Sequence, residues 1–164
     1  MNRNVKNFVL PLLAVVVIIV AFVLNNNKSI VSTSAKNLSL SNYEVNGSIV
    51  IPVNVLTKDV KFYSLYDNGV NIEILAAKDK NGNPKATLNT CQNCMGSPKA
   101  YFIQDGDSVV CQNCGIGHKI ETIGIVKMGC NPIPIDSLVI DDKNLTFEKS
   151  ELLANADLFK TIEK

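Results

Sequence analysis

Two near-identical cysteine pairs constrain the fold of this chain more than any other feature. Cys91-Gln92-Asn93-Cys94 and Cys111-Gln112-Asn113-Cys114 have the same four residue types in the same order, and sixteen residues separate them. This spacing is typical of a site at which four thiolates bind one metal centre. Gly96 and Gly115 follow closely and would supply the positive φ angles that such turns use. The sequence therefore predicts a domain built around a cysteine-ligated metal site.

The spacing alone does not choose the metal. Four thiolates suit a structural zinc ion and an iron-sulfur centre alike, so both remain open at this point. Disulfides are a third reading, but the chain has five cysteines, which cannot all pair with one another. A disulfide within one CxxC pair would also close a very short loop and add little stability.

Two further residues are candidate ligands. Cys130 lies in a segment that contains Pro132 and Pro134, which would hold a thiolate at a fixed position, although a single buried cysteine can equally be a core residue. His118 is the only histidine and follows Cys114 by four residues. A lone histidine is more often a surface or packing residue than a ligand. Copper binding through Cys130, His118 and nearby methionines is a further alternative.

The remainder of the domain has the pattern of β-structure, because short apolar stretches alternate with turn signals. Residues 48–56 are mostly β-branched and contain Pro52, which predicts an edge strand or a strand with a break. Residues 60–66 and 70–76 flank Asp67-Asn68-Gly69, and the Asn-Gly pair favours a tight hairpin turn. In the second arm, apolar residues at 70, 72, 74 and 76 alternate with polar ones, so we expect a hairpin.

Each cysteine pair is predicted to follow a strand. Residues 85–88 lead to Cys91, and a hairpin formed by residues 101–104 and 108–110 leads to Cys111 and brings the two pairs together. Residues 138–140 and 145–147 flank another polar turn. Ser150 would then cap a terminal helix with an apolar face. The predicted fold class is mainly β: a small metal-binding domain with CxxC knuckles and a short C-terminal helix.

An apolar segment precedes this domain. Residues 8–24 form a run of 17 apolar residues, which as a helix would cover roughly 25 Å, near the lower end of what spans a bilayer. Arg3 and Lys6 could also begin a cleaved signal peptide, but residues 25–28 offer no small-residue cleavage site. We therefore predict one uncleaved transmembrane helix over residues 1–24, a polar tether over 25–42 and a metal domain over 43–164.

The distribution of charge along the chain predicts its orientation in the membrane and argues against nucleic acid as a partner. Residues 1–42 carry a net charge of +4 and residues 43–164 one of −3. Positive charge before the apolar run favours a cytoplasmic N-terminus and an extracytoplasmic domain in a single-pass membrane protein. A mildly acidic domain lacks the basic surface that nucleic acid binding requires. With one histidine, no nucleophile motif and no paired carboxylates, a hydrolytic enzyme is not expected, and redox activity stays open.

Residues 60–135 resemble the FtrD-like membrane iron-sulfur proteins, a bacterial family. The resemblance rests on the predicted hairpin, the turn Lys78-Asp79-Lys80-Asn81-Gly82, both CxxC pairs and the aromatic pair Tyr101-Phe102. The most specific element is Gly129-Cys130-Asn131-Pro132-Ile133-Pro134, which generic zinc ribbons do not carry. Two positions differ from the family pattern: His118 replaces an aromatic residue, and Met128 replaces a glycine.

The resemblance implies an iron-sulfur or related redox centre on an extracytoplasmic domain. Cys91, Cys94, Cys111 and Cys114 match the family's two knuckles, and Cys130 matches the cysteine of its Gly-Gly-Cys-Asn-Pro motif. Family members often accompany ferrous-iron permeases, so the expected role is electron transfer or metal handling in iron uptake. Larger relatives have several membrane spans, and here a partner such as a permease or a redox protein would supply their role. The alternatives are a zinc-ribbon-like binding module and a copper-binding protein.

Overall fold

The computed structural model describes residues 37–164. The predicted transmembrane helix over residues 1–24 and most of the predicted tether lie outside the described residues. Within residues 37–164, no helix is long and apolar enough to cross a membrane.

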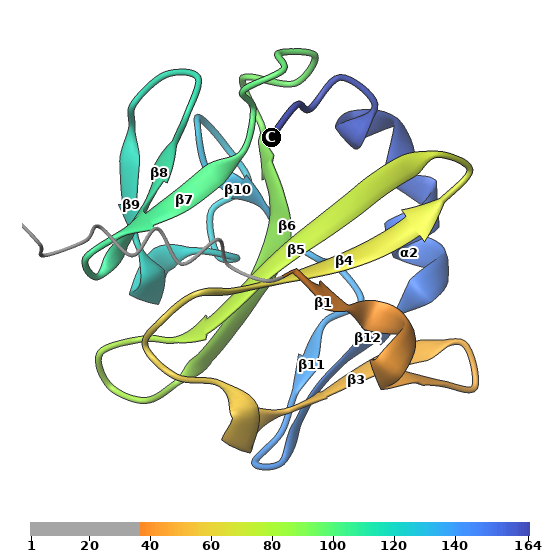
Figure 1. The fold of residues 1–164 in the computed structure, drawn as a ribbon. Coiled ribbons are helices and arrows are strands. Elements are labelled where there is room, and N and C mark those ends of the chain that lie inside the picture. Colours follow the sequence, from red (N-terminus) through yellow and green to blue (C-terminus); the bar gives the residue numbers. More distant parts are fainter. Residues whose placement is uncertain (1–36) are drawn as a thin grey trace, which may run out of the picture. The chain divides into compact units, whose positions relative to one another are not determined.

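The described residues form a mainly β domain of three sheets with one short α-helix near the C-terminus (Figure 1). The central sheet has the order β1-β4-β5-β6-β10 and consists of Leu38–Ser39, Lys61–Asp67, Val70–Lys78, Pro84–Cys91 and Pro132–Ile133. The second has the order β11-β12-β3-β2 and consists of Val139–Ile140, Asn144–Glu148, Ser48–Pro52 and Glu44–Val45. The third has the order β7-β8-β9 and consists of Phe102–Asp105, Ser108–Cys111 and Gly117–Lys119.

The predicted hairpins are present. Strands β4 and β5 pair antiparallel, and the two turn residues Asn68 and Gly69 have φ angles of 46° and 80°. Two successive positive φ angles are what a tight two-residue hairpin turn requires, which explains the Asn-Gly pair at this turn. Strands β7 and β8 form the hairpin that leads to the second cysteine pair.

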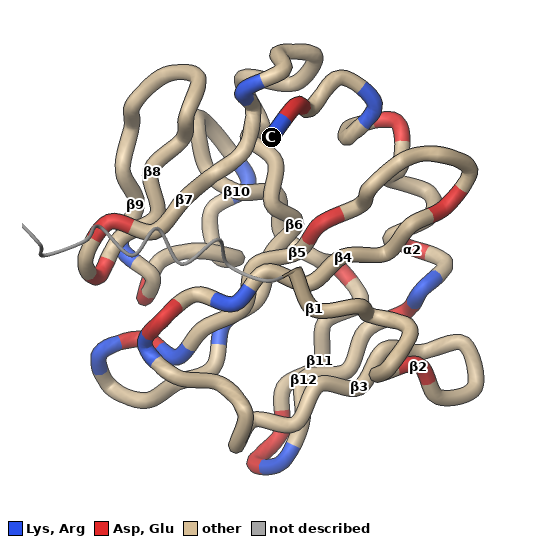
Figure 2. Tube along the Cα trace, viewed as in Figure 1, with Lys and Arg blue, Asp and Glu red and all other residues tan. Residues whose placement is uncertain are grey.

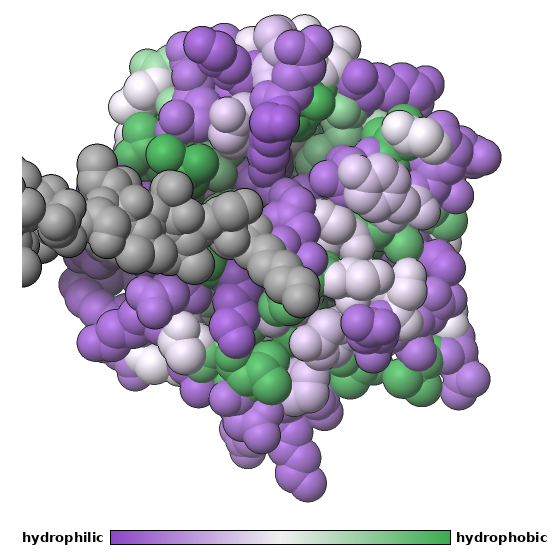
Figure 3. All heavy atoms as spheres, viewed as in Figure 1, coloured by the Kyte–Doolittle hydropathy of each residue, from purple (hydrophilic) through white to green (hydrophobic). Residues whose placement is uncertain are grey.

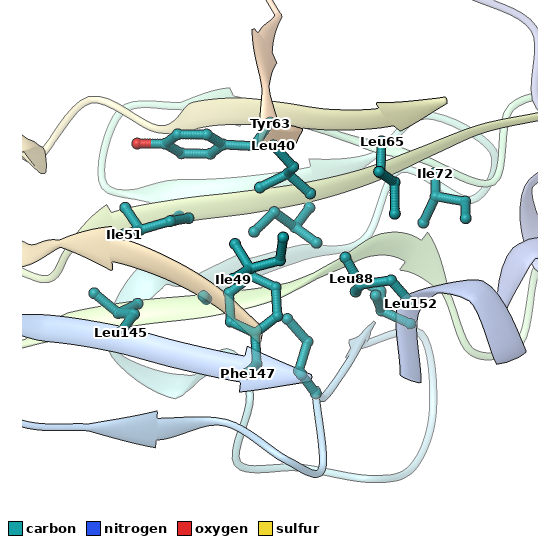
Figure 4. Close-up of a cluster of buried hydrophobic side chains, with 14 of the residues drawn as sticks. Leu40, Ile49, Ile51, Tyr63, Leu65, Ile72, Leu88, Leu145, Phe147 and Leu152 are labelled. Carbon is teal, nitrogen blue, oxygen red and sulfur yellow. The ribbon is translucent and has the colours of Figure 1, made fainter. Parts of the chain in front are cut away.

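Two hydrophobic clusters lie on opposite faces of the central sheet. In the first, side chains of β4, β5 and β6 face those of β3 and β12, with Tyr63, Ile49 and Phe147 among the fully buried ones (Figure 4). The second contains Leu75 and Ala77 of β5, Phe102 of β7 and three of the cysteines. The metal-site sulfurs therefore adjoin one of the domain's two cores.

Strand β5 is buried on both faces. Ile72, Ile74 and Ala76 face the first cluster, and Leu75 and Ala77 are fully buried in the second. The sheet β7-β8-β9 covers this other face, and that arrangement is a long-range contact that local alternation cannot reveal.

The folded domain also begins earlier than the predicted boundary at residue 43. Strand β1 pairs in parallel with β4, and Leu40 in the 3-10 helix Leu40–Tyr43 is fully buried. The predicted break at Pro52 is present, since β3 ends there and the 3-10 helix Val53–Val55 follows. However, β3 lies between β2 and β12 and is not an edge strand.

The C-terminal helix is shorter than expected. Helix α2 spans Lys149–Ala154, followed by the 3-10 helix Ala156–Phe159. Ser150 does not cap α2, because Glu148 occupies the N-cap position and no side chain caps it. The prediction of a Ser150 cap was wrong because β12 runs directly into the helix and Ser150 already lies within the first turn.

The last residue of the chain contacts a buried carboxylate. Lys164 Nζ pairs with Glu73, whose side chain is only 3% exposed, and lies 4.8 Å from the centre of the Tyr101 ring. Asn37 and Asn89 donate amide hydrogen bonds to the same carboxylate at 2.9 and 2.5 Å. Lys164 therefore compensates the negative charge of Glu73, which would otherwise be buried with only amide hydrogen-bond donors around it.

We expect Lys164→Ala to lower the free energy of unfolding by about 1–2 kcal/mol, because it leaves the Glu73 charge without a cation while the lysine itself is partly exposed. Urea denaturation of the two proteins measures the change. In the double variant that also carries Glu73→Gln, the side chain at position 73 is neutral and much of the loss should disappear. An equal loss of unfolding free energy in the single and the double variant would contradict this explanation.

Candidate metal centre

The first cysteine pair continues directly from the central sheet. Cys91 is the last residue of β6, and its N–H donates to the Ala100 carbonyl at 2.9 Å. The N–H of Cys94 donates back to the Cys91 carbonyl at 3.2 Å, so the pair forms a tight turn. Gly96, with φ of 88°, lets the chain reverse after it. Both sulfurs thereby face the same side of the turn.

The second pair is built in the same way at the end of β8. Cys111 is the last residue of this strand, and its carbonyl accepts the Gly115 N–H at 2.9 Å. Gly115 has φ of 73°, as expected for the residue that follows such a knuckle. The Ser97 hydroxyl donates to the Asn113 side chain at 2.6 Å and links the two knuckles directly.

The third segment brings in Cys130. It lies just before β10, in which Pro132 is opposite Cys91 in the sheet register. The Asn131 carbonyl accepts the Gln92 N–H at 3.1 Å. Gly129, with φ of 74°, precedes the cysteine and turns the chain toward the knuckles. Cys130 is therefore placed by backbone contacts with the first knuckle.

All five cysteines meet at one place, and all five are free thiols. The ligand atoms of Cys91, Cys94, Cys114 and Cys130 all lie within 4.8 Å of one another. The Cys111 sulfur is outside this group but lies 3.9 Å from that of Cys94. Distances of this size are far longer than a disulfide bond and suit thiolates that share a bound metal.

Backbone N–H groups point at three of the sulfurs. Asn93 and Cys94 donate to the Cys91 sulfur, Asn113 and Cys114 donate to that of Cys111, and Ile116 donates to that of Cys114. Such contacts favour the thiolate form that metals bind. The side-chain amides of the knuckles, which could also have approached the sulfurs, bond elsewhere: Gln92 donates to the Val126 carbonyl at 3.0 Å, and Gln112 to that of Val110 at 3.0 Å.

Four of the thiols have shifted pKa values. Burial raises the pKa values of Cys91 and Cys111 above the usual range. At Cys114 burial acts in the same direction, but hydrogen bonds from the Ile116 N–H and the Cys130 thiol outweigh it and lower the pKa to about 7. The same hydrogen bond with Cys114, together with burial, raises the pKa of Cys130 to about 11. In the metal-free site, Cys114 therefore ionises before Cys91, Cys111 and Cys130.

Residues 55–159 match the family described as membrane iron-sulfur containing protein FtrD-like. This match covers more than half of the chain and includes both knuckles and the Cys130 segment. The chain belongs to the FtrD-like family. No curated protein and no solved structure matches it. The family membership and the cysteine cluster together indicate that this FtrD-like domain binds a metal.

His118 is not brought into the sulfur group of the FtrD-like domain. It lies on β9 opposite Val109 of β8, and its ring meets that of Phe102 edge to face, with ring centres 6.2 Å apart. Its Nε2 atom is buried and has no hydrogen-bond partner among the described residues. The arrangement fits a packing role.

Asn89 positions the FtrD-like site in a way that the sequence analysis missed. Its side-chain oxygen accepts the Phe102 N–H at 2.8 Å, and its side-chain nitrogen donates to the Phe102 carbonyl at 3.3 Å. These bonds fasten β7 to β6, and β7 pairs with the strand that ends at Cys111. The sequence offered no distinguishing signal, because β6 also contains the polar residues Lys85, Thr87 and Thr90.

The two segments that contain the knuckles carry no charged side chains. Residues 91–98 and 108–118 contain no Asp, Glu, Lys or Arg, and the β8-β9 connection is uncharged in Figure 2. An open hollow of about 510 Å³ borders the first knuckle and the Cys130 segment. Met95, Met128 and the ion pair of Lys127 with Asp136 are among its lining residues. Both methionines are more than half exposed. The face of the domain shown in Figure 3 is largely hydrophilic, with scattered hydrophobic groups.

We expect Cys114 to be the first cysteine alkylated in the metal-free protein. It is exposed, and a pKa of about 7 makes roughly half of it thiolate at neutral pH. The rate of iodoacetamide labelling, followed by peptide mass spectrometry from pH 5 to 9, should rise with pH and level off above about 8. Cys130, with its higher pKa, is the internal control and should react more slowly. A labelling rate whose pH dependence has its inflection near pH 8.5, the pKa of an ordinary cysteine, would contradict the expectation.

Proposed function

We propose that this FtrD-like protein is an electron-transfer or metal-handling component of a bacterial iron-uptake system. The observation that carries the proposal is the convergence of five thiols from three chain segments at a site with a buried and an exposed side. Cys91 and Cys111 are buried, whereas Cys130 is half-buried and Cys114 is exposed. A centre held in this way has one side through which an electron or an ion could be exchanged.

The thiolate donors are compatible with iron. An iron ion bound by thiolates can gain and lose one electron, and its potential depends on hydrogen bonds to the sulfurs and on solvent exposure. The backbone N–H groups that point at Cys91, Cys111 and Cys114 supply such hydrogen bonds. The uncharged surface next to Cys114 and the hollow lined by Met95 and Met128 would allow a partner protein to approach.

The partner in this proposal is a membrane protein, such as a ferrous-iron permease or another redox protein. Membership in a family of membrane proteins supports a membrane location. The proposed topology places residues 1–24 across the membrane, the N-terminus in the cytoplasm and the metal domain outside.

The proposed anchor is tested by washing membranes with carbonate. We expect the full chain to stay in the membrane fraction, because residues 8–24 would be held by the apolar interior of the bilayer. Intact-mass measurement of the extracted protein should include Met1. A mature chain that begins near Lys36, or release of the protein into the wash, would refute the anchor.

The proposed activity is tested by purifying the full chain anaerobically in detergent. Iron and labile sulfide are quantified, and the visible spectrum is followed during reductive titration. A coloured protein with bound iron that is reduced and reoxidised reversibly supports electron transfer. Co-purification with a membrane permease from the source membranes would identify the partner class.

A structural zinc ion is the second candidate. Cys91, Cys94 and Cys111 belong to a hydrophobic cluster together with Phe102 and Leu75, so a metal here would also tie the β7-β9 sheet to the central sheet. Colourless protein with one zinc ion and no redox activity would favour this role. A copper site involving His118 is less well supported, because the histidine ring packs against Phe102.

A further inference from the structure

The arrangement of the sulfurs differs from the one suggested by two CxxC pairs. The group that lies within 4.8 Å contains three knuckle cysteines and Cys130, and it omits Cys111. Cys91 and Cys94 come from the first knuckle, Cys114 from the second, and Cys130 from the segment before β10. Each of these segments is held in place by backbone hydrogen bonds, so the grouping follows from the fold.

The distances within the group suit one metal ion. Four thiolates at about 2.3 Å from a central ion in tetrahedral geometry lie about 3.8 Å from one another. Sulfurs that are already within 4.8 Å need only small movements to reach that geometry. In a multi-iron cluster the thiolates bind different irons, which bridging sulfides separate, so the ligand sulfurs must spread further apart.

Cys111 is a fifth thiol beside this group. It is 1% exposed, and its sulfur lies 3.9 Å from that of Cys94, to which it can donate an S–H hydrogen bond. The thiols of Cys114 and Cys91 are further hydrogen-bond partners of Cys111. The backbone N–H groups of Asn113 and Cys114 point at it. A thiol in this place would influence a neighbouring ligand sulfur without binding the metal itself.

We infer that Cys91, Cys94, Cys114 and Cys130 bind a single metal ion, and that Cys111 is a positioning residue that hydrogen-bonds to Cys94. The inference rests on the proposed function only in requiring that the site bind a metal. It names a ligand set that differs from the four knuckle cysteines, and a mononuclear centre in place of a multi-iron cluster.

A matched pair of variants tests the ligand set. Full-length wild-type, Cys111→Ser and Cys130→Ser proteins are purified anaerobically in detergent and loaded with Fe²⁺ or, as a spectroscopic probe, Cd²⁺. We expect Cys111→Ser to keep one metal per chain, with a shifted midpoint potential for the iron form. Cys130→Ser should lose more than about 100-fold in affinity, beyond the 10–100-fold typical of residues that only support a ligand.

X-ray absorption of the wild-type protein tests the same inference without a substitution. We expect four sulfur neighbours at one distance, no metal neighbour and no labile sulfide. Circular dichroism checks that Cys130→Ser is folded, as its half-buried position suggests. Two or more irons with stoichiometric sulfide, or metal loss in Cys111→Ser but not in Cys130→Ser, would overturn the inference.

The outcomes separate this inference from the proposed function. One iron ion bound by the four named sulfurs but without reversible redox chemistry would leave the ligand set standing and refute electron transfer. A redox-active cluster of several irons would support electron transfer and refute the mononuclear ligand set. Wild-type protein that binds neither Fe²⁺ nor Cd²⁺ would refute both.

Discussion

Replacing Cys91 with serine is expected to abolish stoichiometric metal binding and to lower the melting temperature of the metal-loaded protein by at least about 10 °C. Cys91 is fully buried, and it belongs to the group of four close sulfurs. The binding free energy of a metal that requires the folded site is also folding free energy, and about 4 kcal/mol is lost if the metal stands at a thousandfold excess over its dissociation constant. This loss corresponds to a shift of that size for a domain of this length.

The measurement is a thermal melt of both proteins with and without a chelator, together with metal content per chain. The metal-free proteins are the control: they should melt within a few degrees of each other, since serine is similar in size to cysteine. If the variant melts equally far below the wild type with and without metal, Cys91 contributes by packing, and the metal explanation fails.

Phe102→Ala is expected to destabilise the domain by about 3–5 kcal/mol and also to weaken metal binding. Phe102 is fully buried in the same cluster as Cys91 and Cys111, and it lies opposite Cys111 in the β7-β8 register. Truncating a buried phenylalanine leaves a cavity, which accounts for the loss of stability. The cavity would also loosen the hairpin that carries the second knuckle, so the metal affinity should fall.

Phe147→Ala is the matched control. Phe147 is equally buried, at 1% exposure, but belongs to the cluster on the opposite face of the central sheet (Figure 4). We expect a similar loss in free energy of unfolding by urea denaturation and an unchanged metal affinity at temperatures where the variant is folded. Equal loss of metal affinity in both variants would show that the site depends on global stability and not on the Phe102 cluster.

The local features of the fold could be predicted because they depend on residues close together in the sequence. The Asn68-Gly69 turn is an example: its positive φ angles require residues that tolerate them, and such residues are visible without a structure. The cysteine knuckles are another, since each is a short turn at the end of a strand. The family resemblance, which the match over residues 55–159 confirms, also came from local motifs.

Features that depend on contacts between distant segments could not be predicted. The burial of Leu75 on the second face of β5 results from the β7-β9 sheet, which comes later in the chain. The polar Glu73 would have marked an exposed face, but Lys164, ninety-one residues away, compensates its charge. Alternation along one strand carries no information about what covers each face.

The sequence by itself determined that this protein is mainly β and that its cysteines form turns suited to a metal. Only the tertiary structure decided how the five sulfurs group, placing Cys130 with three knuckle cysteines and leaving Cys111 beside Cys94. The physical reason is that a turn fixes the direction of its own two thiolates through local backbone hydrogen bonds. The distance between thiolates of different segments depends instead on how β6, β8 and β10 pair and pack.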